Sequence, residues 1–229
     1  MSTRVFVGAP ADPAHVLLDA GESHYLRRVR RVADGATIDA IDDRGGLWTA
    51  EVVSGDARGT VVRLVTERAV PQPAREVVVL LGMPEPAAVL DLLPGLCELG
   101  VAEVVLVRCA RSQGAAPGAD RIARVLRAAQ RQCGRPRGPA ISGPVDLREA
   151  TTRRADLPGL FAWEELRATS SDALIVSAGA RVCVGPEGGF TPDEASALLA
   201  AGFRALSLGP YTLRTETAAL VAVARVMFA

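Results

Sequence analysis

Residues 184–194 read VGPEGGFTPDE and follow the apolar, strand-like run at 181–184. Thr191 is a favourable helix N-cap, Pro192 suits the first helical position, and Glu194 completes a capping box with Thr191. The three glycines of the segment therefore lie in a turn that leads from a strand into a capped helix. Because such a turn offers free main-chain N–H groups to a ligand, the segment predicts a binding loop.

A second glycine-bearing loop lies close to the C-terminus. Residues 206–218 read LSLGPYTLRTETA and connect a short apolar run to an apolar helix. Gly209 ends the run, and the polar residues Arg214 and Glu216 precede the helix. Two such loops, each after a strand, predict one cofactor held largely by main-chain groups. A structural ion pair or helix cap is the alternative role for Arg214 and Glu216.

The chain around these loops alternates between strands and helices from residue 77 onward. The pattern predicts helices over 87–99, 120–133, 192–201 and 217–227. It predicts strands over 77–82, 101–107, 173–177, 181–184 and 205–208. This alternation is typical of an α/β fold, in which helices cover a parallel sheet.

The first 70 residues have a different pattern. Strands are expected over 4–7, 36–41, 47–53 and 59–65, with about one helical turn near 23–31. Short strands at regular spacing are typical of a small barrel. Residues 70–74 read VPQPA, a stiff linker with two prolines. The sequence therefore predicts two domains, a β-barrel over 1–70 and an α/β domain over 74–229.

Composition excludes several classes of protein. The chain contains no lysine, so it has neither the lysine of a Walker P-loop nor that of a pyridoxal phosphate enzyme. Its four cysteines are isolated from one another and it has only two histidines, so no metal site is expected. No apolar run approaches the ~20 residues of a membrane span, and the N-terminus lacks a signal-peptide core. We therefore expect a cytoplasmic protein with no membrane partner.

Two clusters of arginine indicate contact with RNA, although the formal net charge of the chain is zero. The first cluster recurs every three or four residues along the expected helix over 120–133 and just beyond it: Arg121, Arg124, Arg127, Arg131 and Arg135. These side chains share a face of about 120°, and a stripe of one sign is unusual for a helix that is merely solvated. The second cluster is the run Arg27, Arg28, Arg30 and Arg31 beside His24 and Tyr25. Arginine binds phosphates and a neighbouring aromatic ring stacks on unpaired bases, so this combination is suited to RNA. For both clusters the alternative is a charged face that is merely solvated.

These motifs resemble those of a known family. Residues 185–190 with the acidic pair at 193–194, followed by residues 208–210 and 213–218, are similar to two motifs of the RsmE family of 16S ribosomal RNA methyltransferases. Further matches are His24 with Arg30, residues 98–100 and residues 132–135. The matches occur in the same order as in the family and span nearly the whole chain.

The resemblance implies a fold and a reaction. The RsmE family belongs to the SPOUT superfamily, whose C-terminal α/β domain contains a deep trefoil knot. Its members carry an N-terminal PUA-like β-barrel, form homodimers and bind S-adenosylmethionine in the knot. They methylate N3 of a specific uridine in the 16S rRNA of the small ribosomal subunit.

The resemblance and the arginine clusters together assign site residues. The candidates for cofactor binding are Gly185, Pro186, Glu187, Gly188, Gly189, Leu208, Gly209, Leu213, Thr217 and Ala218. The candidates for RNA binding are His24, Arg27, Arg30, Arg121, Arg124, Arg131 and Arg135. The predicted RNA-binding domain is the PUA-like barrel over 1–70, and the SPOUT domain over 74–229 is predicted to carry the chemistry.

Arg214 and Glu216 are the candidate catalytic residues. N3 of uridine carries a proton that must leave, so a positioned base assists the reaction. A nearby cation stabilises the negative charge that develops on the base of the nucleotide. We assign Arg214 as the cation, and Glu216 as the base or as the group that orients Arg214.

The chain departs from the family at four positions. Ala88 and Gly95 stand where members usually carry lysine, Arg131 where the residue is usually acidic, and Tyr211 where arginine is frequent. Three other functions therefore stay open: a SPOUT methyltransferase with a different RNA target, a catalytically inactive RNA-binding relative, and a nucleotide-dependent metabolic enzyme. The last lacks support, because no Gly-x-Gly-x-x-Gly motif follows the strand at 77–82.

Overall fold

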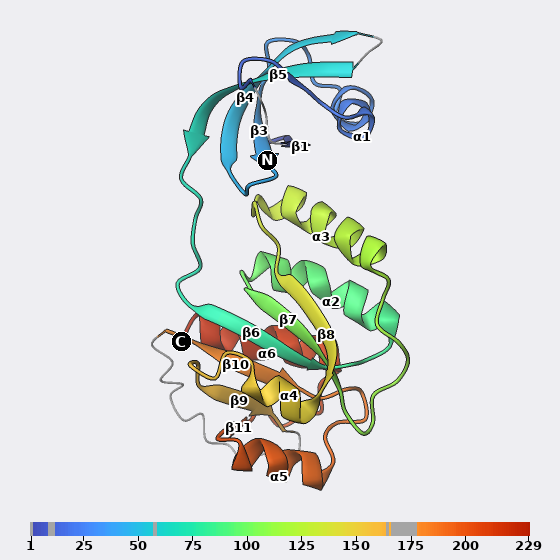
Figure 1. The fold of residues 1–229 in the computed structure, drawn as a ribbon, viewed down its shortest axis with the longest axis vertical. Coiled ribbons are helices and arrows are strands. Elements are labelled where there is room, and N and C mark those ends of the chain that lie inside the picture. The colour runs from blue at the N-terminus through green and yellow to red at the C-terminus, as the bar shows by residue number, and fades with distance from the viewer. Residues whose placement is uncertain (1, 9–11, 57–58, 164, 166–177) are drawn as a thin grey trace. The chain divides into compact units, whose positions relative to one another are not determined.

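The computed structural model describes residues 2–8, 12–56, 59–163, 165 and 178–229 (Figure 1). The chain divides into two compact units. The first consists of residues 1–71 with 130–137, and the second of residues 72–129 with 138–229. Each unit has its own hydrophobic core.

The first unit is built on a five-stranded sheet. Its strands are β1 (Arg4–Val7), β2 (Val16–Leu17), β3 (Thr37–Asp42), β4 (Leu47–Asp56) and β5 (Gly59–Arg68), in the order β1-β3-β4-β5-β2. β1 pairs with β3 in parallel, whereas the other neighbouring pairs are antiparallel. The helix α1 (Ala20–His24) continues into the π-helical turn η1 (Tyr25–Val29). The four predicted strands and the helical turn are confirmed, and β2 is an addition.

The core of this unit follows from alternation along the strands. β5 buries every second residue in its first half, as expected for a strand with one face inside. Asp19 caps α1 by accepting a hydrogen bond from the main-chain N–H of Glu22 at 2.7 Å. The cap fixes the start of α1, which leads into η1, where Leu26 is fully buried in the core.

The second unit is built on a six-stranded parallel sheet, which confirms the prediction of an α/β fold. Its strands are β6 (Glu76–Gly82), β7 (Glu103–Arg108), β8 (Ala140–Asp146), β9 (Gly159–Ala162), β10 (Gly179–Val184) and β11 (Arg204–Leu206). The order is β11-β9-β10-β6-β7-β8, and the paired strands run parallel. The helices are α2 (Pro86–Glu98), α3 (Ala119–Cys133), α4 (Leu147–Thr152), α5 (Pro192–Ala200) and α6 (Thr215–Met227), and the last four residues of α3 are counted in the first unit.

The helices pack onto this sheet in two groups. α6 lies against β6, β10 and α2, while α4 lies against β7, β8 and α5 (Figure 1). Because helices cover it, the central strand β6 is apolar and buried from Val77 to Gly82 rather than alternating, and β10 is buried at every position, Arg181 included. Gly100 has a φ of +83° directly after α2, which is the conformation that ends a helix at glycine.

Three elements of the second unit were not predicted: β8, α4 and β9. β8 contains Gly143 and Pro144, which interrupt the apolar run from which a strand is recognised. β9 has only four residues, and α4 has six with a single buried side chain, Ala150. The predicted strand over 173–177 lies outside the described residues. The four predicted helices are confirmed, with boundaries that differ by one or two residues.

Candidate cofactor site

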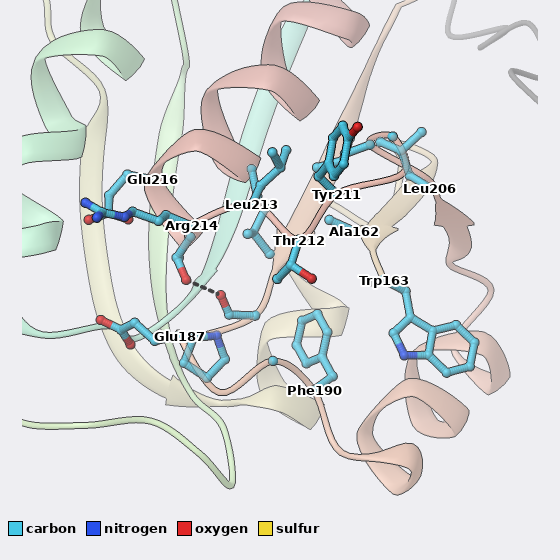
Figure 2. Close-up of a pocket in the computed structure, with 18 of the residues that line it drawn as sticks. Ala162, Trp163, Glu187, Phe190, Leu206, Tyr211, Thr212, Leu213, Arg214 and Glu216 are labelled. Atoms are coloured by element: carbon cyan, nitrogen blue, oxygen red, sulfur yellow. Dashed lines mark hydrogen bonds between the residues drawn. The ribbon is translucent and has the colours of Figure 1, made fainter. Parts of the chain in front are cut away.

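A cavity of about 430 Å³ opens at the carboxyl ends of three adjacent strands, β11, β9 and β10. This edge is where open parallel sheets bind their ligands, and the volume is within the range of small-molecule sites. The segments that follow the three strands form its walls (Figure 2). The lining consists of residues 162, 163, 184–187, 189, 190, 206, 208–216 and 218.

The first glycine loop joins β10 to α5 as predicted. The main-chain N–H of Gly189 donates to the Pro186 carbonyl at 2.8 Å, and Gly189 has a φ of +69°, a conformation that glycine adopts easily. The capping box is present in full. Thr191 Oγ1 accepts from Glu194 N at 3.2 Å, and Glu194 Oε2 accepts from Thr191 N at 2.9 Å. The loop is therefore held at its turn and at the start of the helix.

A buried hydrogen bond connects the two loops. The Thr215 hydroxyl donates to the Gly185 carbonyl at 3.3 Å, and it is the dashed contact in Figure 2. Thr215 is buried at the first position of α6, and Gly185 is buried directly after β10. The bond thus fixes the start of α6 against the end of the neighbouring strand.

The second loop, residues 207–214, leads from β11 to α6. Arg225 of α6 donates from Nη1 to the Ser207 carbonyl at 2.5 Å, which anchors the start of the loop. Gly209 has a φ of +120°, a backbone conformation that other residues rarely adopt. Within the part of the chain that the structure describes, the main-chain N–H groups of Leu208, Thr212 and Leu213 have no protein acceptor. These donors are available to a bound ligand.

Apolar side chains form the inner wall of the cavity. Val184, Phe190, Leu206 and Ala218 are all buried or nearly so. Trp163, which directly follows β9, stacks on Phe161 with ring centroids 5.9 Å apart. A buried apolar wall beside free main-chain donors is suited to a flat heteroaromatic group with polar edges.

Charged side chains lie at the rim. Arg214 is exposed, and among the described residues its side chain has no hydrogen-bond or ion-pair partner. Arg214 is the N-cap residue of α6 but forms no side-chain cap, so neither the structural pair with Glu216 nor a capping role is present. Glu187 is also exposed and accepts a hydrogen bond from the Glu85 N–H at 2.9 Å. Arg214, Glu216 and Glu187 lie on one side of the cavity in the view of Figure 2.

Most predicted cofactor residues line this cavity. Gly185, Pro186, Glu187, Gly189, Leu208, Gly209, Leu213 and Ala218 all belong to the lining, as do Arg214 and Glu216. Two do not: Gly188, whose carbonyl accepts from Arg111 Nη1 at 2.6 Å, and the exposed Thr217. Sequence reasoning missed Ala162, Trp163, Phe190 and Leu206. Ala162 ends a strand that was not predicted and Trp163 follows it, while Phe190 and Leu206 lie in the two quoted loops but were not assigned to the cofactor.

The first unit holds a second, polar hollow of about 460 Å³. Its lining consists of Ser23, His24, Arg27, Arg28, Asp34, Gly55, Gly59 and Thr60. The Arg27 side chain is bonded within this unit, since its Nη1 donates to the Val32 carbonyl at 2.8 Å and its guanidinium forms an ion pair with Asp34. Arg30 is exposed and donates from Nε to Thr3 Oγ1 at 3.3 Å. His24 and Arg28 are exposed at the hollow.

The arginine stripe of α3 does not share one environment. Arg131 belongs to the first unit, where its Nη2 lies 2.5 Å from Oε1 of the buried Glu22. Its guanidinium carbon lies 4.0 Å from the centre of the Tyr25 ring, a cation–π contact. Arg121 and Arg124 are exposed, without a hydrogen-bond or ion-pair partner among the described residues. Arg127 is exposed and Arg135 is half-buried.

The cysteines take no part in the cavity. Cys97, Cys109, Cys133 and Cys183 are free thiols. Burial raises the pKa of the Cys109 thiol to about 12, and the nearby Glu194 carboxylate contributes in the same direction. The described residues contain no group of three or more side chains that could hold a metal ion. None of the described helices has the length and apolarity that a membrane crossing requires.

Comparisons with known proteins agree on one kind of protein. Residues 71–227 match the family model of an RNA methyltransferase domain, and residues 18–65 match that of an RNA methyltransferase PUA domain. The ribosomal RNA small subunit methyltransferase E of Mycobacterium bovis is 31% identical over 95% of this chain and 87% of its own length. The ribosomal RNA small subunit methyltransferase E of Synechocystis is 28% identical over 93% of this chain and 73% of its own length. The crystal structure of a ribosomal RNA small subunit methyltransferase E from Neisseria gonorrhoeae, bound to S-adenosyl methionine, has a TM-score of 0.84 and 25% identity. It covers 98% of this chain and 96% of its own.

Proposed function

Because the chain belongs to the RNA methyltransferase family, with an α/β methyltransferase domain and a PUA domain, we propose that it methylates N3 of one uridine in 16S rRNA. The methyl donor is S-adenosylmethionine, the ligand of the similar Neisseria structure. The chain is therefore an S-adenosylmethionine-dependent rRNA methyltransferase, and the resemblance to the RsmE family is confirmed. The observation that carries the finer proposal is the cavity at the ends of β9, β10 and β11, with Arg214 at its rim and no described residue paired with it.

The residues of the cavity fit the proposed cofactor. Phe190, Leu206 and Ala218 provide an apolar wall for the adenine ring. The free N–H groups of Leu208 and Leu213 are suited to the polar edge of the ring and to the ribose. When bound, the cofactor supplies a methyl group on a positively charged sulfur.

The reaction needs a proton removed and a charge stabilised. As the bond between uridine N3 and the methyl carbon forms, the bond between that carbon and sulfur breaks, and the N3 proton leaves. Arg214 is exposed at the rim and has no competing partner among the described residues, so its guanidinium is available to one of the carbonyl oxygens beside N3, which leaves N3 itself open to the methyl group. Glu216, on the same side of the rim, is the candidate to accept the proton or to orient Arg214.

The remaining parts of the proposal follow the family. We assign RNA binding to residues 1–70, with His24 and Arg30 exposed there, and methyl transfer to residues 74–229. Arg121 and Arg124 are available to RNA phosphates. A trefoil knot in the α/β domain, a homodimer and a cytoplasmic location belong to the same proposal.

Methyl transfer to unmodified small ribosomal subunits tests this function. Purified protein is incubated with labelled S-adenosylmethionine and with subunits from cells that lack the modification, and the product nucleoside is identified by mass spectrometry. We expect 3-methyluridine at a single 16S site. Another methylated nucleoside or another RNA would favour a SPOUT enzyme with a different target. No transfer, with S-adenosylmethionine still bound in calorimetry, would favour an inactive RNA-binding relative.

The Arg214→Ala variant tests the catalytic assignment. Loss of one charge-stabilising donor costs about 100- to 1,000-fold in rate. We expect a loss of that size in methyl transfer, with the affinity for S-adenosylmethionine retained. The matched control is Arg204→Ala, which removes an exposed arginine at the start of β11, the opposite end of that strand from the cavity. Equal activity of the two variants would exclude the assigned role of Arg214.

A further inference from the structure

Tyr211 is an aromatic side chain without a partner among the residues that the structure describes. It lies in the loop between β11 and α6, lines the cavity and is 82% exposed. Large aromatic side chains normally bury most of their surface, so an exposed ring at a cavity needs a reason. Figure 2 shows the Tyr211 ring apart from the rings of Trp163 and Phe190.

The other tyrosine and both tryptophans have intramolecular partners. Tyr25 lies under the Arg131 guanidinium, Trp48 Nε1 donates to Asp42 Oδ2 at 2.9 Å, and Trp163 stacks on Phe161. Tyr211 forms no ring contact and no hydrogen bond with any residue that the structure describes. Within the described part of the chain, the amphipathic ring of Tyr211 is therefore left without a partner, and it lies in the lining of the cavity.

The backbone on both sides of Tyr211 is anchored. Arg225 holds the Ser207 carbonyl at one end of the loop, and Thr215 holds the Gly185 carbonyl at the other. A loop held at both ends presents the ring at its middle with less freedom than a tail would have. Ordering the ring against a ligand then costs less entropy, which favours a recognition role.

We propose that Tyr211 stacks on the base of the target nucleotide and so positions it beside Arg214. This inference rests on the proposed function. Buried residues of the inner wall serve the cofactor, whereas the exposed rim, including Tyr211 and Arg214, meets a ligand that arrives from solvent. A base is the chemistry that fits an exposed ring, because unpaired bases of RNA are held by stacking on aromatic side chains.

Stacking is also compatible with the reaction. A ring that covers the face of the uracil leaves its edge free, and N3 and its two flanking carbonyl oxygens lie on that edge. Arg214 belongs to the same loop and the same cavity lining, so it can approach the edge while Tyr211 covers the face. Tyr211 is therefore a positioning residue, and Arg214 remains the charged group at the reacting atoms.

The test compares Tyr211→Ala, Tyr211→Leu and Tyr211→Phe in steady-state methyl transfer to unmodified small ribosomal subunits. Loss of one base stack corresponds to about a 5- to 150-fold loss of affinity. We expect the Ala and Leu variants to raise KM for the subunits by that factor. The Phe variant keeps the ring and stays near wild type. The dissociation constant for S-adenosylmethionine, measured by calorimetry, is unchanged in all three.

A second exposed aromatic residue provides the control. Phe228, 78% exposed after the end of α6, is not part of the cavity lining, so Phe228→Ala keeps the wild-type KM. The inference is overturned if Tyr211→Leu retains the wild-type KM. It is also overturned if Tyr211→Ala weakens the binding of S-adenosylmethionine as much as the binding of the subunits. It is also overturned if the change in KM accompanies dissociation of an oligomer in sedimentation, since the ring then contacts another copy of the chain. An inactive wild type would contradict the proposed function instead, and subunit binding by the same variants would still test the stack.

Discussion

The hydrogen bond between the two cofactor loops leads to a quantitative prediction. In Thr215→Val the hydroxyl is replaced by a methyl group of nearly the same size, and the Gly185 carbonyl loses its donor. No other donor among the described residues reaches that carbonyl, and both residues are buried. A buried polar group left without a partner costs about 1–3 kcal/mol. We expect the unfolding free energy of the α/β unit to fall by that amount.

Urea unfolding followed by helical circular dichroism measures this change, because α2, α5 and α6 all belong to the α/β unit. The unfolding free energy falls by about 2 kcal/mol for each 1 M of urea, so a loss of about 2 kcal/mol in unfolding free energy lowers the urea midpoint by roughly 1 M. The control Thr217→Val makes the same change two residues later, where the side chain is exposed and forms no bond to a described residue. Equal midpoints for the two variants would refute the reasoning. Since the bond fixes the cofactor loops, Thr215→Val also weakens binding of S-adenosylmethionine.

Three further predictions concern arginine and cysteine. Arg131→Ala removes the cation that is paired with the buried Glu22 carboxylate, while the hydrogen bond from the Phe6 N–H to Glu22 stays. Unfolding of the first unit therefore becomes easier by about 3–5 kcal/mol, measured by differential scanning calorimetry, and a change below about 1 kcal/mol would contradict this. The double variant Arg121→Gln with Arg124→Gln leaves stability unchanged. The slope of the logarithm of RNA affinity against the logarithm of salt concentration becomes shallower by about 1.4. An unchanged slope would exclude contacts of these two arginines with phosphates. Because the pKa of Cys109 is raised to about 12, its thiol stays protonated at pH 8 and resists alkylation in the folded protein, and iodoacetamide labelling mapped by mass spectrometry checks this.

Local signals explain what the sequence could predict. The capping box of Thr191 and Glu194 involves residues three apart, so its pattern is visible in the sequence and its geometry occurs as expected. The glycine loops follow the same rule, because a strand, a turn and a helix start are encoded in about ten consecutive residues. The cofactor candidates in those loops therefore lie together in one cavity, apart from Gly188 and Thr217.

Features that depend on distant residues were not predictable. Trp163 reaches the cavity because β9 lies between β11 and β10 in the sheet, an order that no local pattern contains. The bond from Thr215 to Gly185 joins residues that are 30 positions apart. Arg131 repeats the spacing of Arg121 and Arg124, yet only Arg131 meets a buried carboxylate, that of Glu22, which is 109 positions away. Identical residues on one helical face thus acquire different environments from the tertiary structure.

In the proposed function, the cavity separates cofactor binding from target recognition between its buried and its exposed residues. Its inner part depends on buried groups such as Leu206 and Thr215, where a substitution disturbs packing or leaves a polar atom unpaired. Its outer part carries Tyr211 and Arg214, whose exposed side chains contribute little to folding. If Tyr211 stacks on the target base as proposed, a change at position 211 alters contact with RNA at little cost in stability or in affinity for the cofactor. An enzyme built this way can retain its methyl donor while the outer residues adapt to the nucleotide that it recognises.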